Sequence, residues 1–253
     1  DVATTSPGGA LYNALAQGVD IKLVSRWAAL APGAQGHAML VRTDLAESGR
    51  IQSPQDLKGR TLAITARGQY THLAATRFLE ANGLSEADVR IVNMPYPDMI
   101  AALENGAIDV AIMADPHITL ATDKGVGVRW VNHSEYMPDL TVTVMMYAQR
   151  LIEQERAAGE RFMRAVVKSM QYVNDALEDP AKRAEVARIF AQYLPVEDPT
   201  ICDRMMWHHF TADSPRIDRA DLMDQLDWYA GQGIIPRRPN LDQYIDDGFV
   251  DAL

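Results

Sequence analysis

Residues 1–24 read DVATTSPGGALYNALAQGVDIKLV, and residues 109–131 read DVAIMADPHITLATDKGVGVRWV. Both segments begin with Asp-Val-Ala and continue through a Pro, a stretch containing Leu-Ala, a Gly-Val pair and a second apolar run. The two copies differ by single-residue shifts, so they share a plan and do not form a tandem array. Each copy predicts a strand, a turn, a helix and a second strand. The apolar runs at 21–24 and 126–131 are typical of buried parallel strands.

The second copy has a lead-in that the first copy lacks. Residues 97–104 have helical spacing, with Met99, Ile100 and Leu103 on one face, and Asn105-Gly106 ends the helix. Asp1 already stands at the start of a strand, so the repeat predicts that a helix and an earlier strand precede it. We therefore expect the first lobe to be incomplete in this sequence, with part of its ligand cleft missing.

Beyond the repeat, strands alternate with helices up to residue 131, and helices dominate the later part. We expect strands at 37–43, 61–65, 89–94 and 140–147, and helices at 72–82, 161–177, 180–193, 200–210 and 218–231, with a short helix in the tail from 240. The pattern predicts an α/β part followed by a mostly helical C-terminal part. The segments 37–43 and 140–147 are expected to cross between two lobes.

Composition excludes several classes of protein. The chain has 253 residues, a formal net charge of −10 and a single cysteine. No basic tract indicates a nucleic-acid partner, and no apolar run approaches the roughly 18 residues of a membrane span. One cysteine cannot form an intrachain disulfide, so cysteine usage leaves the compartment open.

A series of short motifs resembles a known family. The sequence contains DVATTSP at 1–7, GRTLAI at 59–64, GQYTH at 68–72, NGAIDV at 105–110 and DP at 115–116. In this order and spacing, the motifs resemble the nitrate/sulfonate/taurine-type solute-binding proteins, which include the NMT1/THI5-like group. The similarity runs over essentially the whole chain.

The resemblance implies a periplasmic-binding-protein type II fold, with two α/β lobes, parallel-rich sheets flanked by helices and a ligand closed between the lobes. Residues 1–42 and 141–253 would form the first lobe, and residues 43–140 the second. The implied function is to bind a small anionic or aromatic solute and deliver it to the permease of an ABC importer. A complete member would be periplasmic or extracellular and membrane-anchored. The oligomeric state stays open.

Candidate ligand contacts follow from the expected sheets. Ligands of open α/β sheets bind beyond the carboxyl ends of strands, which here are residues 4–8, 65–71, 94–98 and 113–117. Each of these segments precedes a probable helix start, where free amides and the helix dipole attract anions. The predicted ligand-binding residues are Thr4, Thr5, Ser6, Gly8, Trp27, Arg67, Gln69, Tyr70, Thr71, Tyr96, Asp115 and His117.

These residues offer different chemistry, and each has a structural alternative. The hydroxyl and amide groups at 4–6 and 69–71 are neutral donors, although Ser6 and Thr71 could simply cap helices. Gly8 would allow close approach of a ligand or merely form a turn. Arg67 would pair with an anion or lie on the surface. Trp27 and Tyr96 would stack on an aromatic solute or pack at the rim.

No cofactor, metal ion or catalytic residue is predicted. His37, His72 and His117 fall in or beside the candidate loops, but they lack HxxxH or HExxH spacing. An enzyme on the same scaffold is the alternative function, either a hydrolase using Ser6, a nearby His and Asp115, or a synthase of a pyrimidine precursor. GxSxG, GxxxxGK[ST] and CxxC motifs are absent from the sequence. We expect Cys202 to lie far from the cleft.

Overall fold

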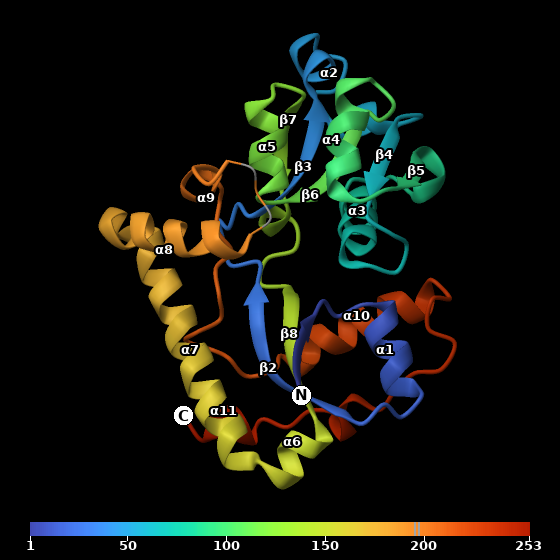
Figure 1. The fold of residues 1–253 in the computed structure, drawn as a ribbon. Coiled ribbons are helices and arrows are strands. Elements are labelled where there is room, and N and C mark those ends of the chain that lie inside the picture. The colour runs from blue at the N-terminus through green and yellow to red at the C-terminus, as the bar shows by residue number, and fades with distance from the viewer. Residues whose placement is uncertain (195, 197) are drawn as a thin grey trace.

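Two sheets, each with its own helices, form two lobes in the computed structural model of the protein, which describes residues 1–194, 196 and 198–253 (Figure 1). The first sheet has the order β1-β8-β2 and the second the order β5-β4-β6-β3-β7. The first sheet contains β1 (Val2–Thr5), β2 (Ile21–Ala29) and β8 (Thr141–Ala148). The second contains β3 (His37–Arg42), β4 (Thr61–Ile64), β5 (Arg90–Asn93), β6 (Val110–Ala114) and β7 (Gly127–Asn132). The predicted α/β class is confirmed.

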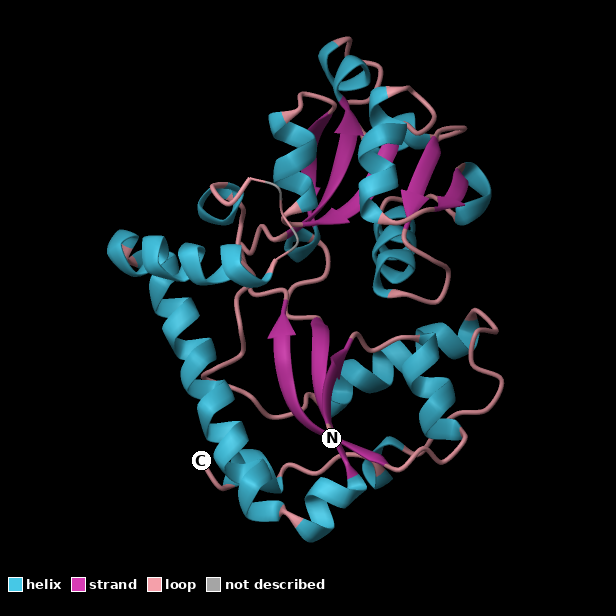
Figure 2. Ribbon diagram, viewed as in Figure 1, coloured by secondary structure: helices cyan, strands magenta, loops and turns pink. Residues whose placement is uncertain are grey.

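Helices cover both lobes (Figure 2). Those that accompany the second sheet are α2 (Thr43–Glu47), η1 (Pro54–Leu57), α3 (Tyr70–Ala81), η2 (Glu86–Asp88), α4 (Tyr96–Glu104), α5 (His117–Asp123) and η3 (His133–Glu135). The remaining helices are α1 (Gly9–Ala16), α6 (Gln149–Gln154), α7 (Arg156–Glu178), α8 (Pro180–Tyr193), α9 (Ile201–Arg204), α10 (Arg219–Gly231), η4 (Leu241–Gln243) and α11 (Gly248–Asp251). None of these described helices combines the length and apolar character needed to cross a bilayer.

The internal repeat corresponds to two equivalent units. The first copy forms β1-α1-β2 and the second forms β6-α5-β7. In each unit the two strands lie on either side of a strand from elsewhere in the chain, β8 in the first sheet and β3 in the second. The repeat in the sequence is therefore a repeat of the two lobes.

The central strands change the pairing that the apolar runs predicted. β1 and β2 both pair antiparallel with β8, and β6 and β7 both pair antiparallel with β3. The two strands of a copy are parallel to each other but never adjacent, so their direct neighbours are antiparallel. Parallel pairing is limited, among the described strands, to β4 with β5 and β6. The three-stranded sheet is therefore antiparallel, and the five-stranded sheet is mixed.

The expected crossing segments are strands within the sheets. Residues 37–42 form β3 inside the five-stranded sheet, and β8 lies inside the three-stranded sheet. The chain crosses from the first sheet to the second just before β3 begins at His37. It returns to the first sheet just before β8 begins at Thr141. The expected division placed residues 1–42, and so β3, in the first lobe. We now propose that β3 belongs to the second lobe, because it pairs within the five-stranded sheet.

The predicted helices are largely confirmed, with one exception. The segment 200–210 is helical only over α9, and Met205 is already extended. Beyond it the backbone N–H of Met206 donates to Asp115 Oδ2 at 3.2 Å, and Phe210 forms an isolated bridge with Ala28. These contacts with β6, β2 and their loops draw the chain out of helical form, as tertiary contacts often override local propensity.

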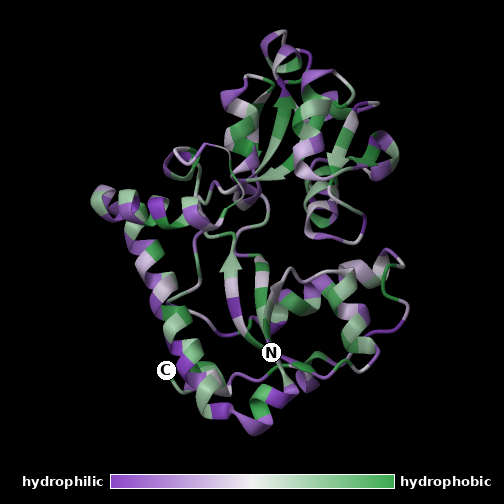
Figure 3. Cartoon of the chain, in the orientation of Figure 1, coloured by the Kyte–Doolittle hydropathy of each residue, from purple (hydrophilic) through white to green (hydrophobic). Residues whose placement is uncertain are grey.

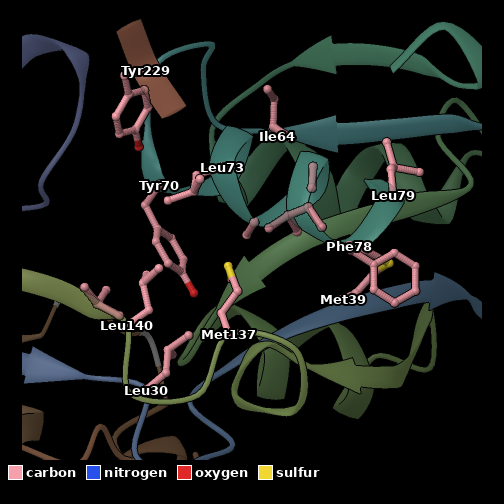
Figure 4. Close-up of a cluster of buried hydrophobic side chains, with 14 of the residues drawn as sticks. Leu30, Met39, Ile64, Tyr70, Leu73, Phe78, Leu79, Met137, Leu140 and Tyr229 are labelled. Carbon is pink, nitrogen blue, oxygen red and sulfur yellow. The ribbon is translucent and has the colours of Figure 1, made fainter. Parts of the chain in front are cut away.

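One hydrophobic core extends through both lobes. It includes Leu11 and Tyr229 from one side and Leu73 and Phe78 from the other. Figure 4 shows the ring of Tyr70 pointing toward Leu30, Met137 and Leu140 in the crossing segments. The strands are predominantly hydrophobic, whereas many helices carry both polar and apolar residues (Figure 3). This packing fixes the end of β4 and the start of α3, where the cavity lies.

Candidate functional site

A cavity of about 250 Å³ lies between the two lobes. Ser6 follows β1, and Thr65 follows β4, so the cavity is at the carboxyl ends of one strand from each sheet, where open α/β sheets bind ligands. Its lining consists of Ser6, Trp27, Ala28, His37, Thr65, Gln69, Tyr70, Thr71, Tyr96, Val142, Thr143, His208 and Phe210. The volume suits a small solute.

The lining contains no Lys, Arg, Asp or Glu among the residues that the structure describes. Its polar groups are hydroxyls, one carboxamide, two imidazoles and the indole N–H of Trp27. Helices α3 and α4 begin at lining residues, Tyr70 and Tyr96, and α1 begins three residues after Ser6. The free N–H groups and positive dipole ends of these helices favour a negatively charged group without a resident cation.

The cavity brings together half of the predicted contacts. Ser6, Trp27, Gln69, Tyr70, Thr71 and Tyr96 all line it. The side chains of Ser6 and Thr71 do not cap helices, because neither α1 nor α3 has a side-chain hydrogen bond at its N-terminus. The Thr71 hydroxyl instead accepts from Thr65 N at 2.9 Å and lies 2.6 Å from Thr65 Oγ1. Thr71 thus holds the β4–α3 turn. Direct ligand contact by these residues stays a prediction.

The other predicted residues lie outside the cavity lining. Thr4 and Thr5 belong to β1 and face pairing partners in β8. Gly8 lies where the lobes meet, since a Cβ there would come within 3.0 Å of Gly68 O. The close approach expected at Gly8 is therefore that of another backbone segment.

Arg67, Asp115 and His117 are likewise occupied by protein contacts. Arg67 is half exposed and pairs with Glu86 at 2.7 Å, so the surface alternative describes it better than pairing with a bound anion. Asp115 pairs with Arg129 at 3.3 Å and accepts from Thr119. The His117 ring lies 5.2 Å from the Tyr96 ring, behind the cavity wall. These side chains support the walls of the cavity.

His37, Thr65, Thr143, His208 and Phe210 were not predicted as ligand contacts. Thr143 lies within a strand, and no local pattern marks it as a cavity residue. His208 was expected on a helix next to His209, but the segment is extended and only His208 reaches the cavity. Two signals were available: Thr65 begins the strand-end segment 65–71, and His37 lies beside the candidate loops.

The histidines around the cavity are neutral near pH 7. Burial lowers the pKa of His37 well below its ordinary value, and the neighbouring His208 and His133 lower it further. Burial also lowers the pKa of His208, and it lowers the pKa of His133 to about 3. His133 Nδ1 lies 2.6 Å from Tyr70 Oη, whose own pKa is raised well above its usual value by burial. The cavity therefore presents uncharged imidazoles.

Nothing in the arrangement assembles a catalytic or metal site from the described residues. The Ser6 hydroxyl makes no hydrogen bond to a described side chain, and Asp115 bonds to Thr119 and not to a histidine. Cys202 is buried in a separate cluster with Trp207 and α8. Within residues 1–194, 196 and 198–253, no three His, Cys, Asp or Glu side chains are grouped to hold a metal ion.

The lobes touch each other beside the cavity. Gly9 N donates to Gly68 O at 2.9 Å, and Arg77 in α3 pairs with Asp224 in α10 at 2.5 Å. Arg204 in α9 pairs with Asp123 in α5 at 2.6 Å. These contacts hold the two lobes against each other beside the cavity, which stays partly open to solvent.

Comparison with known proteins gives a consistent result. The family model described as NMT1/THI5 like matches residues 1–182. No curated protein sequence matches the chain. Three of the solved structures that match are described below. Each shares 12–19% sequence identity with this chain, and at that level a match shows similarity of fold alone.

The first is the ligand-binding component of an ABC-type import system from Staphylococcus aureus with zinc bound, at 15% identity and a TM-score of 0.78, covering 99% of this chain and 80% of that chain. The periplasmic aliphatic sulphonate-binding protein from Escherichia coli has 19% identity and a TM-score of 0.77, with coverage of 97% and 79%. The periplasmic nitrate-binding protein from Synechocystis PCC 6803 has 12% identity and a TM-score of 0.75, with coverage of 98% and 73%. The two-lobed binding-protein fold is thus confirmed.

Proposed function

Since the chain belongs to the NMT1/THI5-like family, we propose that it binds a small anionic or aromatic solute in the cavity between its lobes and delivers it to an ABC importer. The observation that carries the proposal is a cavity between two lobes that is lined only by neutral groups and at whose lining residues two helices begin. Binding requires no catalytic group, and such a lining provides donors and shape without reactive chemistry.

Two features of the lining favour the proposed solute class. Ser6 and Gln69 carry polar groups, and the starts of α3 and α4 supply positive dipole ends. Trp27, Tyr96 and Phe210 provide aromatic surface against which a planar or apolar part packs. Thr4, Thr5, Gly8, Arg67, Asp115 and His117 are proposed to act indirectly, by shaping the walls.

Delivery would use a hinge motion of the lobes. The chain crosses twice between the sheets, before β3 and before β8, and these two segments are natural hinges. Similar structures include a component of an ABC-type import system and two periplasmic binding proteins. We propose the same setting, with a permease as partner and a periplasmic or extracellular, membrane-anchored location.

A ligand screen tests the proposal. Melting temperatures would be measured with alkanesulfonates, benzenesulfonate, nitrate, aromatic carboxylates and pyrimidines, and positive compounds would be titrated by calorimetry. A solute present at 100 times its Kd should stabilise the protein by about 2.7 kcal/mol. Ser6→Ala and Gln69→Ala should weaken that binding, whereas Gln17→Ala, in the turn after α1 and outside the cavity lining, should not. If no solute from any of these classes stabilises the protein, the proposed function is wrong.

A further inference from the structure

Two imidazole rings lie against each other in the wall of the cavity. His37 begins β3 in the second lobe, and His208 lies in the extended segment that joins β2 through the bridge between Ala28 and Phe210. Their ring centroids are 4.6 Å apart. Gly36 makes room for the contact, because a Cβ there would lie 3.2 Å from His208 Nδ1. The pair thus joins the two sides of the cavity at one point.

No side-chain hydrogen bond joins either ring of this pair to the described residues, and neither ring is among the fully buried groups that lack a partner, so their nitrogens are open to the cavity. His37 is only 7% exposed, and His208 is partly buried. These nitrogens are therefore free to form hydrogen bonds with whatever occupies the cavity. Both rings line the cavity, where a solute can supply the missing partner.

The surrounding charges are already neutralised. Asp115, whose charge raises the pKa of His208, is paired with Arg129 and accepts from Thr119 and from Met206 N. His133 stacks on His37 at 6.0 Å between centroids, and Tyr70 packs edge-on at 5.2 Å. Burial keeps His133 neutral and raises the pKa of Tyr96 to about 12, so Tyr96 is neutral too. His117 lies behind Tyr96, and burial lowers its pKa.

An anion bound in such a cavity is stabilised further by a compensating positive charge. Transfer of an unpaired ion from water into protein costs several kcal/mol, and helix ends and neutral donors offset only part of that cost. The His37–His208 pair supplies the cavity-lining groups that can gain a positive charge near neutral pH. An anion beside an imidazole raises its pKa and favours the protonated form.

On the premise of the proposed function, we propose that His37 and His208 recognise the anionic group of the solute, and that the pair takes up one proton from solvent as the anion binds. The proton adds to a free ring nitrogen, so the protonated ring has two N–H donors. The second ring stays neutral, because two positive charges this close repel each other. The complex is then electrically balanced, and affinity increases as the pH falls.

Calorimetry at one pH in two buffers measures the proton directly. The wild-type protein is titrated with benzenesulfonate or a short alkanesulfonate, whichever binds in the screen, because sulfonates remain ionised across the range. Tris and bis-Tris are suitable, since they differ in ionisation enthalpy and, as cations, do not compete for an anion site. We expect uptake of about one proton and up to a tenfold gain in affinity for each pH unit between about pH 8 and 6.5.

Histidine variants assign the proton to the pair. His37→Gln and His208→Gln should each remove most of the uptake and flatten the pH dependence, while His209→Gln, the adjacent residue outside the cavity lining, should leave both unchanged. Melting curves identify any variant that fails to fold. If one of the two cavity variants, His37→Gln or His208→Gln, does not fold, the other is used for the test. Tight binding of the sulfonate with no proton uptake, or full uptake in both variants, would overturn the inference while leaving the proposed function intact. Failure of all solutes to bind the wild type would remove the function itself.

Discussion

Gly9 in the first lobe donates its backbone N–H to the carbonyl of Gly68 in the second lobe at 2.9 Å. Gly68 has a φ of +79°, a left-handed conformation that suits glycine, and a Cβ on Gly9 would lie 2.5 Å from Ile234 Cγ2. The lobes therefore meet backbone to backbone, with no side chain between them. This contact is close enough for small substitutions to change the closed state.

Gly8→Ala should weaken solute binding without unfolding the protein. The new Cβ would lie 3.0 Å from Gly68 O, an atom of the backbone across the interface, so closure would require the lobes to separate slightly. We expect roughly a tenfold loss of affinity, which corresponds to about 1.4 kcal/mol, measured by calorimetry. Gly231→Ala is the control, because a Cβ there meets nothing within 4 Å. Equal affinities in Gly8→Ala and wild type would show that the contact does not limit closure.

Arg77→Met should reduce solute affinity in a salt-dependent manner. Arg77 pairs with Asp224 across the lobes, but both groups are partly exposed, so the pair contributes only about 0.2–1 kcal/mol. We expect a twofold to fivefold loss at low ionic strength that disappears at about 1 M salt, where charges are screened within a few ångströms.

The control for this variant is Lys124→Met, which removes a pair with Glu104 inside the second lobe. It should leave affinity unchanged at any salt concentration. A loss in Arg77→Met that persists at high salt would mean that packing of the side chain matters and not its charge.

The sequence predicted the architecture better than the site. The repeat defined two strand–helix–strand units because alternating apolar runs and cap residues are local signals. The insertion of β3 and β8 between their strands is a long-range pairing, and no local signal encodes it. For the same reason 200–210 reads as a helix, although Asp115 and Ala28, both distant in sequence, hold part of it extended.

The site shows a similar limit. Ser6, Gln69 and Tyr96 follow strand ends, so the general rule for α/β sheets places them at the cavity. Arg67 fits that rule equally well, but Glu86, 19 residues further along, binds its guanidinium. His208 comes to the cavity only because the extended segment passes beside Gly36. Contacts between segments that are distant in sequence decide which candidate residues face the cavity. A single short motif does not predict such contacts.

Acid should destabilise this protein before its carboxylates titrate. The buried His133 has a pKa of about 3, below the ordinary value of 6.5, so the unfolded chain binds more protons than the native protein between these values. The free energy of unfolding therefore decreases as the pH falls below about 6.5, by an amount on the order of 1.4 kcal/mol per unit for this one group. Urea unfolding between about pH 7 and 4.5 measures it.

His133→Gln provides the comparison for the acid effect. It removes the titrating ring while keeping a polar group near Tyr70 Oη, so its curve should be flatter over the same range, even if its stability at pH 7 is lower. His209→Gln removes a histidine that is only partly buried; it is the control and should retain the wild-type slope. A slope that is the same in His133→Gln and wild type would assign the effect to other groups.

Phe210→Ala should change the preferred length of the solute. A second cavity of about 220 Å³ adjoins the first, and the two share His208 and Phe210 in their walls. The second cavity is mainly apolar, with Phe190, Met205 and Trp207 in its lining. Removal of the Phe210 ring should join the two spaces, so that a long-chain or biaryl sulfonate gains affinity while a short sulfonate loses apolar contacts and binds more weakly.

Phe190→Ala separates the loss of the wall from simple enlargement. It widens the second cavity but leaves Phe210 in place, so it should retain the wild-type preference for short solutes. Competition calorimetry with a short and a long sulfonate gives the preference as a ratio of Kd values, which does not depend on the fraction of folded protein. We expect that ratio to shift toward the long solute by about tenfold in Phe210→Ala, since a few buried methylene groups contribute about 0.8 kcal/mol each. The same shift in Phe190→Ala would show that Phe210 does not divide the cavities.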